Sequence, residues 1–155
     1  LFIAMLLNSD EKAVGKLLKH PRSNIALSDA GAHLTFFNDA GYGLYMLQKW
    51  VRENKLMSIE EAIYNLTGKQ ADIYRIDQRG RLVPGQHADM MLLDPEEVSV
   101  SQSYRVNDLP GGGSRLNIDG QGIKGVWVNG QRVLEDGNLI NKTEFPGKVI
   151  RGFHA

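Results

Sequence analysis

The chain has 155 residues, which is enough for an ordinary domain with a substantial core. Its 18 Lys and Arg residues balance its 18 Asp and Glu residues, so no net charge draws it toward nucleic acid or an anionic membrane, and a small neutral partner is expected. The chain has no cysteine, which excludes a disulfide framework and a thiolate metal site.

The first segment, residues 1–7, is apolar but far shorter than a membrane span. It has no basic residue before it and does not begin with Met, so it lacks the pattern of a signal peptide. We expect a cytoplasmic protein whose sequence begins within a longer chain.

The cap-type residues of the segment 8–11, with Glu11 three residues after Asn8, predict a helix N-terminus there and a helix that follows to about His20, where Pro21 ends it. The apolar run at residues 24–28 then has the length and composition of a buried parallel strand. Helix followed by strand is the order found in a (β/α) barrel, in which ligands gather at the carboxyl ends of the strands. Asp29 would therefore stand at a ligand-binding mouth, with His33 as a second titratable group.

Two further helices are predicted after this loop. Apolar residues at helical spacing predict one over residues 44–53, with Trp50 in the core. Ser58 and Glu61 fit a capping box for the next, which should end near Gly68 and be followed by a short turn at residues 70–74.

From Gly80 onward the pattern changes to short strands separated by Gly, Pro, Asn and Asp. Residues 90–93 form an apolar strand, and Asn129-Gly130 is a strong hairpin signal between residues 125–128 and 131–134. A second turn is expected at residues 136–137. We read Asp89, before the first strand, as structural.

Five motifs occur in the order seen in one enzyme family, and together they cover most of the chain. They are Ser28-Asp29, Asn65-Leu66-Thr67-Gly68, G-x-L-x-P-G-x-x-A-D at 80–89, V-x-V-N-G at 126–130 and P-G-x-V-x-R at 146–151. The chain thus resembles the C-terminal part of metal-dependent amidohydrolases of the N-acyl-D-amino-acid deacylase (D-aminoacylase) family.

The resemblance implies an α/β fold that is the end of a (β/α)8 barrel followed by a small β-sandwich domain. Residues 1–78 would hold the last barrel helices and the eighth strand, and residues 79–155 the C-terminal part of the sandwich. In this family the sandwich also uses N-terminal strands that this sequence lacks. The uncovered strand edges predict a homo-oligomer.

The resemblance also implies zinc, and hydrolysis of an N-acyl amino acid or a related linear amide. Asp29 would act as general base and proton shuttle for a metal-activated water and would also touch the metal. We assign substrate binding to Ser28, His33 and Arg115, the last because its planar fork suits a substrate carboxylate. The family's other zinc ligands, including a His-x-His pair, are absent from this sequence, so the chain alone should be inactive.

Two alternatives stay open. The chain would be a non-catalytic scaffold or oligomerisation module if it stands alone, and the parent enzyme would be a cyclic-amide hydrolase of the dihydropyrimidinase kind if the substrate is a ring. The residues do not distinguish a linear from a cyclic amide.

Overall fold

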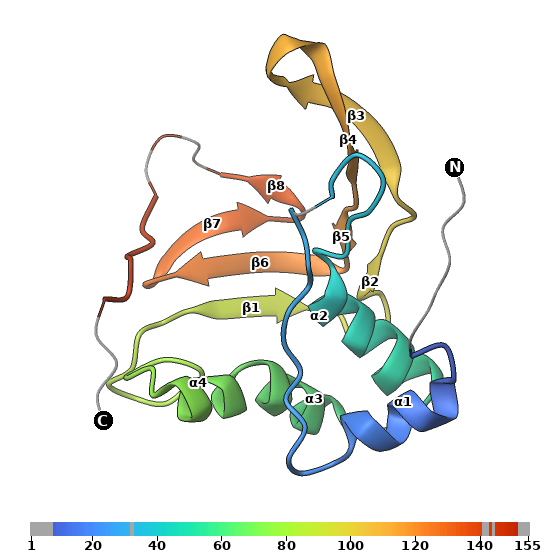
Figure 1. Cartoon of the computed structure of the whole chain (residues 1–155). Helices are drawn as coiled ribbons and strands as arrows, with labels where there is room; N and C mark the ends of the chain where they lie inside the picture. Colours follow the sequence, from blue (N-terminus) through green and yellow to red (C-terminus); the bar gives the residue numbers. More distant parts are fainter. Residues whose placement is uncertain (1–7, 32, 141–142, 144, 152–155) are drawn as a thin grey trace.

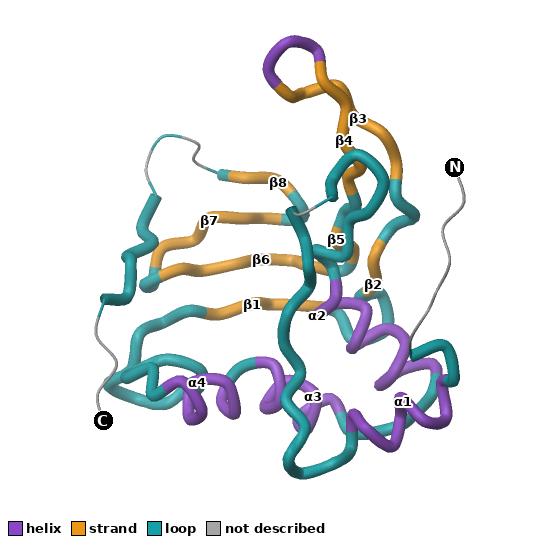
Figure 2. Tube along the Cα trace, in the orientation of Figure 1, coloured by secondary structure: helices purple, strands orange, loops and turns teal. Residues whose placement is uncertain are grey.

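The computed structural model describes residues 8–31, 33–140, 143 and 145–151, which form a mixed α/β arrangement (Figure 1). Helices occupy the first half of the chain and strands the second, and a long loop separates the first helix from the next (Figure 2). Within the described residues, no helix has the length and apolar character needed to cross a membrane. The apolar segment at residues 1–7 lies outside the described residues.

The first helix, α1 (Glu11–Leu18), begins within the segment 8–11 that was predicted to start it. Its cap is Asp10, whose carboxylate accepts hydrogen bonds from the backbone N–H groups of Lys12 and Ala13 at 2.9 and 3.2 Å. Asn8 is not the cap, because it has a left-handed backbone with φ of 57° that an N-cap does not use. The buried face of α1 includes Gly15, where a side chain would meet Trp50 and Leu56.

The next helix is not the single α-helix that was predicted. It consists of α2 (Tyr42–Tyr45) continued by the π-helix η1 (Met46–Glu53). The wider turns are seen at its end, where Asn54 N–H donates to the Lys49 carbonyl at 2.9 Å. Trp50 packs partly buried against the core, as predicted.

The helix start predicted at Ser58 is confirmed, with Ser58 as its N-cap. Ser58 Oγ accepts a hydrogen bond from Glu61 N–H at 3.1 Å and starts α3 (Ile59–Leu66). The short turn predicted at residues 70–74 is instead part of a second helix, α4 (Gly68–Tyr74), which ends at Arg75 in a left-handed conformation.

The second half of the chain forms antiparallel strands, as predicted. One four-stranded sheet has the order β1-β6-β7-β8, and two ribbons pair β2 with β5 and β3 with β4. The hairpin β3–β4 projects away from the four-stranded sheet (Figure 1). The strands are β1 (Met90–Leu93), β2 (Ser99–Val100), β3 (Tyr104–Leu109), β4 (Gly113–Asn117), β5 (Gly120–Gln121), β6 (Ile123–Val128), β7 (Gln131–Glu135) and β8 (Asn138–Leu139).

Two turns of this sheet follow directly from the sequence. Asn129 and Gly130 have φ values of 49° and 80° and join β6 to β7, as the hairpin signal predicted. Asp136 and Gly137 join β7 to β8 in the same way.

Asp89 has the structural role predicted for it. Its carboxylate accepts a hydrogen bond from Asn129 N–H at 2.8 Å and forms an ion pair with Arg79. Partial burial disfavours the charged carboxylate, but the bond from Asn129 and the Arg79 guanidinium outweigh this effect, so the pKa of Asp89 lies below its usual range. Asp89 thereby ties the start of β1 to the β6–β7 turn.

The buried core lies between the helices and the strands. It contains Met46, Leu47, Met57, Ala62 and Val98, with Leu93 and Ile123 packed against it. Val98 precedes β2 and is only 1% exposed, so this core joins side chains from both halves of the sequence.

Beyond the core, the same face of the sheet carries an apolar row. Met91, Val126, Leu134 and Leu139 are cross-strand neighbours from β1 to β8. Met91 and Leu139 are 43% and 55% exposed. The described residues therefore provide one layer of strands here, and the predicted β-sandwich needs a second layer.

The strand predicted at residues 24–28 is not present in the structure. These residues are extended coil, Leu27 has a left-handed backbone with φ of 67°, and its side chain is 86% exposed. A parallel strand needs hydrogen bonds from neighbouring strands, and the described residues place none beside this segment. Asp29 accordingly follows a coil rather than a core strand.

Candidate functional site

The segment that leads to Asp29 is held by side chains from α4 and the end of α3. Lys69 Nζ donates to the Ser23 carbonyl at 2.5 Å, and Gln70 Nε2 donates to the Ile25 carbonyl at 2.9 Å. Lys69 Nζ also donates to Asn65 Oδ1 at 3.3 Å, and Asn65 is itself buried. The Asn65–Gly68 motif and the two residues after it thus fix the approach to Asp29.

Asp29 stands in a turn that exposes its carboxylate. Its φ is 52°, a left-handed conformation that Asp tolerates better than most residues. Ser28 Oγ accepts a hydrogen bond from Ala30 N–H at 3.2 Å, which closes the turn next to it. Among the described residues, no hydrogen-bond donor and no cation contacts the Asp29 carboxylate. This acid is therefore available to solvent and to a ligand.

A second carboxylate, Asp39, lies near Asp29 and was not selected from the sequence. Burial raises the pKa of the Asp39 carboxyl above its usual range, and the negative charge of Asp29 raises it further. The nine residues between them hide this proximity in the sequence. In the sequence, the Asn38-Asp39 pair indicates only a loop.

His33 lies in the same loop, where its ring stacks on Phe36 with centroids 5.1 Å apart. Its carbonyl accepts hydrogen bonds from the N–H groups of Phe36 and Phe37 at 3.0 and 2.9 Å, so the loop turns tightly after it. His33 is exposed and remains a candidate for substrate contact.

Arg115 comes from β4, and its fork already holds a carboxylate. Nε and Nη2 donate to the two oxygens of Asp108 at 2.8 and 2.7 Å, and Nη1 donates to Asn117 Oδ1 at 3.2 Å. The hydrogen bonds from Arg115 lower the pKa of Asp108. A substrate carboxylate would have to compete with Asp108 for this fork.

The described residues do not form a metal site on their own. Nowhere among them do three His, Cys, Asp or Glu side chains come together closely enough to hold a metal ion. Asp29 is an exposed carboxylate, and a single ligand is too few for a protein zinc site.

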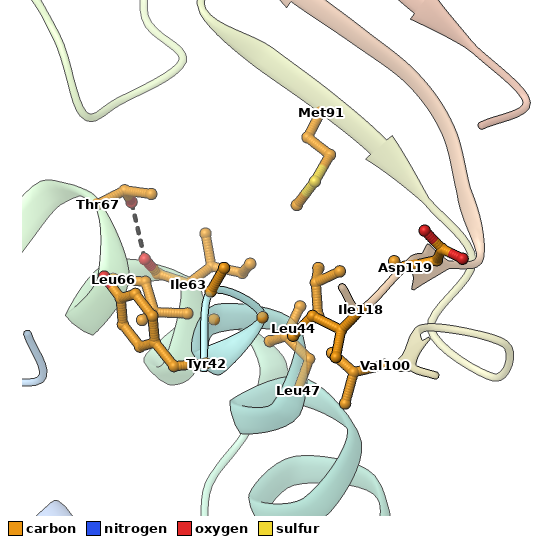
Figure 3. A pocket seen from close by; sticks show the side chains of 14 residues that line it. Tyr42, Leu44, Leu47, Ile63, Leu66, Thr67, Met91, Val100, Ile118 and Asp119 are labelled. Carbon is orange, nitrogen blue, oxygen red and sulfur yellow. Dashed lines mark hydrogen bonds between the residues drawn. The ribbon is translucent and has the colours of Figure 1, made fainter. Parts of the chain in front are cut away.

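An apolar pocket of about 450 Å³ begins where the Asp29 loop ends, at Ala40 and Gly41. Leu44, Leu47 and Met91 line it, with Asp119 at one side (Figure 3). The Thr67 hydroxyl beside it donates a hydrogen bond to the Ile63 carbonyl at 2.7 Å. The lining of this pocket is mainly apolar.

Comparison with known proteins gives a match along most of the chain. A family model described as "Amidohydrolase family" matches residues 4–134. N-acyl-D-aspartate deacylase of Alcaligenes xylosoxydans xylosoxydans is 32% identical over 143 residues, which is 91% of this chain and 26% of that protein. N-acyl-D-glutamate deacylase of the same organism is 26% identical over 146 residues, covering 92% of this chain and 27% of that protein.

Solved structures of D-aminoacylase are also similar, with a TM-score of 0.50 and 27% identity over 64% of this chain and 19% of the other. One of them concerns the binuclear metal centre of that enzyme. The chain spans about a quarter of the length of the curated relatives it matches.

Proposed function

Because the chain belongs to the amidohydrolase family, we propose that it is the C-terminal part of a hydrolase that cleaves the carbon–nitrogen bond of an N-acyl-D-amino acid or a similar linear amide. The relatives named as deacylases of N-acyl-D-aspartate and N-acyl-D-glutamate support this substrate class. The match over most of the chain is what favours an enzyme over a non-catalytic scaffold.

In the longer protein, residues 1–78 would complete a (β/α)8 barrel and residues 79–155 a β-sandwich. Two features support this division. The segment at residues 24–28 is extended and lacks neighbouring strands within the described residues, and the apolar row on the four-stranded sheet is partly exposed. Strands from the rest of the protein would satisfy both. As a separate chain, the protein would cover the same surface by forming a homo-oligomer.

Asp29 is the residue of this chain that we place in the reaction. Its exposed carboxylate, free of donors and cations among the described residues, is the observation that carries this assignment. Asp29 would accept a proton from the water whose oxygen attacks the amide carbon. When the carbon–nitrogen bond breaks, it would return that proton to the departing nitrogen. A carboxylate already held by an Arg or Lys would be a weaker base for this purpose.

The metal centre would come mainly from the rest of the protein, since the described residues do not supply a ligand set. We propose zinc, with Asp29 as a ligand from this chain. A bound zinc ion supplies Lewis acidity that lowers the pKa of water.

Substrate contacts would come from Ser28 and His33, which flank Asp29 in sequence, and from Arg115 if the substrate carboxylate displaces Asp108. The partner is a small molecule. A cytoplasmic location is part of the same proposal.

The test is hydrolysis of N-acyl-D-aspartate and its L-enantiomer by the longer protein and by the 155-residue chain. We expect the longer protein to hydrolyse the D-compound and the chain alone to be inactive. Turnover of a cyclic dihydropyrimidine, with none of the linear amide, would favour a cyclic-amide hydrolase. A longer protein inactive on both would contradict the proposal.

A further inference from the structure

The hairpin β3–β4 belongs to the strand-rich half of the chain, yet it contacts the loop that follows Asp29. Leu116 N–H donates to the Leu34 carbonyl at 2.6 Å, and the Leu116 carbonyl accepts a hydrogen bond from Asn38 Nδ2 at 3.1 Å. Alternate residues of an antiparallel strand turn both backbone groups away from their partner strand. Both such groups of Leu116 are therefore filled by the loop, one by the Leu34 carbonyl and one by the Asn38 side chain.

A second contact comes from the other strand of the hairpin. Arg105 Nη2 donates to the Thr35 carbonyl at 3.1 Å, while Nη1 donates to Ser114 Oγ at 3.0 Å. Arg105 thus ties β3, the start of β4 and the loop together. The hairpin holds the loop at Leu34, Thr35 and Asn38.

The far end of the loop is fixed by close packing. A Cβ on Gly41 would lie 2.6 Å from Val100 Cγ1 and 3.0 Å from Ile118 Cδ1, so the backbone there sits directly against the strands. Such an approach leaves no room for a side chain. The loop is thus anchored from Leu34 through to the start of α2.

We infer that the β3–β4 hairpin positions the loop that carries Asp29, residues 29–41, with Asn38 as the main positioning residue. This inference rests on the proposed role of Asp29. Asp29 and Leu27 adopt left-handed conformations in an exposed turn, so contacts on either side must keep the carboxylate in place. Lys69 and Gln70 hold the chain before the turn, and the hairpin holds it after.

Catalysis is sensitive to such positioning, because a shift of about 1 Å at a reacting group can lower the rate by about 100-fold. Removal of the contacts between the hairpin and the loop should therefore lower kcat more than it raises KM. The Asp29 carboxylate itself would be unchanged, so the pH dependence of the reaction should keep its shape.

Asn38 allows a test that separates positioning from local turn formation. Its Oδ1 accepts a hydrogen bond from Ala40 N–H at 3.0 Å, while its Nδ2 reaches Leu116. Asn38→Ser keeps an oxygen that can accept from Ala40 but is too short to reach the hairpin. Asn38→Ala removes both bonds. If the contact with the hairpin matters, both variants should lose kcat to a similar extent, by about 10–100-fold.

Two further variants complete the design. Arg105→Met releases the loop from the hairpin side without altering the loop sequence, and it should also lower kcat. Tyr104→Phe is the matched control, because Tyr104 Oη donates to Asp119 Oδ1 at 3.0 Å and forms no hydrogen bond with the loop among the described residues. It should leave kcat unchanged.

The experiment measures kcat, KM, the pH–rate profile and the melting temperature of these variants in the longer protein, beside Asp29→Asn. Loss of kcat in Asn38→Ser and Arg105→Met, with an unaltered pH profile and melting temperature, supports the inference. Wild-type kcat in Asn38→Ser while Asp29→Asn is inactive overturns the inference and leaves the proposed function standing. An active Asp29→Asn variant overturns both.

Discussion

Replacing Gly122 by Ala should destabilise the protein strongly, because two separate effects act at this position. Gly122 lies between β5 and β6 with φ of 72°, where an L-residue is strained by about 1–2 kcal/mol. The added Cβ would also lie 2.5 Å from Val98 N and 2.7 Å from the Glu97 carbonyl carbon. Both contacts are with backbone, so no side chain can rotate away, and Val98 belongs to the core.

Overpacking of this kind costs about 1–3 kcal/mol, so the free energy of unfolding should fall by about 2–5 kcal/mol in all. Gly137→Ala is the matched control, since Gly137 has φ of 81° but a Cβ added there would meet nothing within 4 Å. It should lose only the backbone contribution, about 1–2 kcal/mol.

Urea denaturation followed by circular dichroism measures both variants against the wild-type chain. The midpoint of Gly122→Ala should lie clearly below that of Gly137→Ala, with similar slopes. Equal midpoints for the two variants would refute the reasoning, because they would mean that a Cβ at position 122 does not clash with the backbone of Glu97 and Val98.

Three other expectations follow from local contacts. Asp89→Asn should lower the free energy of unfolding at neutral pH. Because the pKa of Asp89 is depressed in the folded protein, the difference in stability from the wild type should shrink below about pH 4, as the carboxylate protonates. A difference in urea midpoint that does not change with pH would contradict this. Ser58→Ala should cost about 0.5–2 kcal/mol by removing the cap of α3, whereas Ser58→Asp should restore it. The chain alone should self-associate through its exposed apolar row, and a clean monomer mass in light scattering would count against this.

Features set by neighbouring residues could be predicted from the sequence. Asn129-Gly130 specifies its own left-handed turn, and Ser58 supplies the oxygen that its helix start needs, so the hairpin and the Ser58 N-cap were confirmed. The apolar strand at Met90–Leu93 was also predictable, because it pairs with β6 within the same chain.

Features that depend on distant partners were not predicted correctly. The apolar residues at 24–28 suit a barrel strand, but without strands beside them in the described residues they are coil. The Ile25 carbonyl accepts a hydrogen bond from Gln70 Nε2 instead of from a neighbouring strand. The π-helical turns of η1 likewise have no signature in a pattern read at helical spacing.

For the candidate site, the order of motifs was enough to select Asp29, and this assignment stays a prediction. The proximity of Asp39 to Asp29 could not be predicted from the sequence. The hydrogen bond from Asn38 to Leu116 could not be predicted either, because the two residues are 78 positions apart. Arg115 was chosen for its fork, and only the structure shows that Asp108 fills it.

The central claim is tested most directly by the rate of amide hydrolysis by Asp29→Asn in the longer protein. Asn keeps the size of Asp but cannot accept the proton, so the rate should fall by about 10²–10⁴-fold with the melting temperature unchanged. Asp10→Asn makes the same chemical change at another exposed position, where Asn still caps α1, and should keep the wild-type rate. A near wild-type rate in Asp29→Asn would contradict the account.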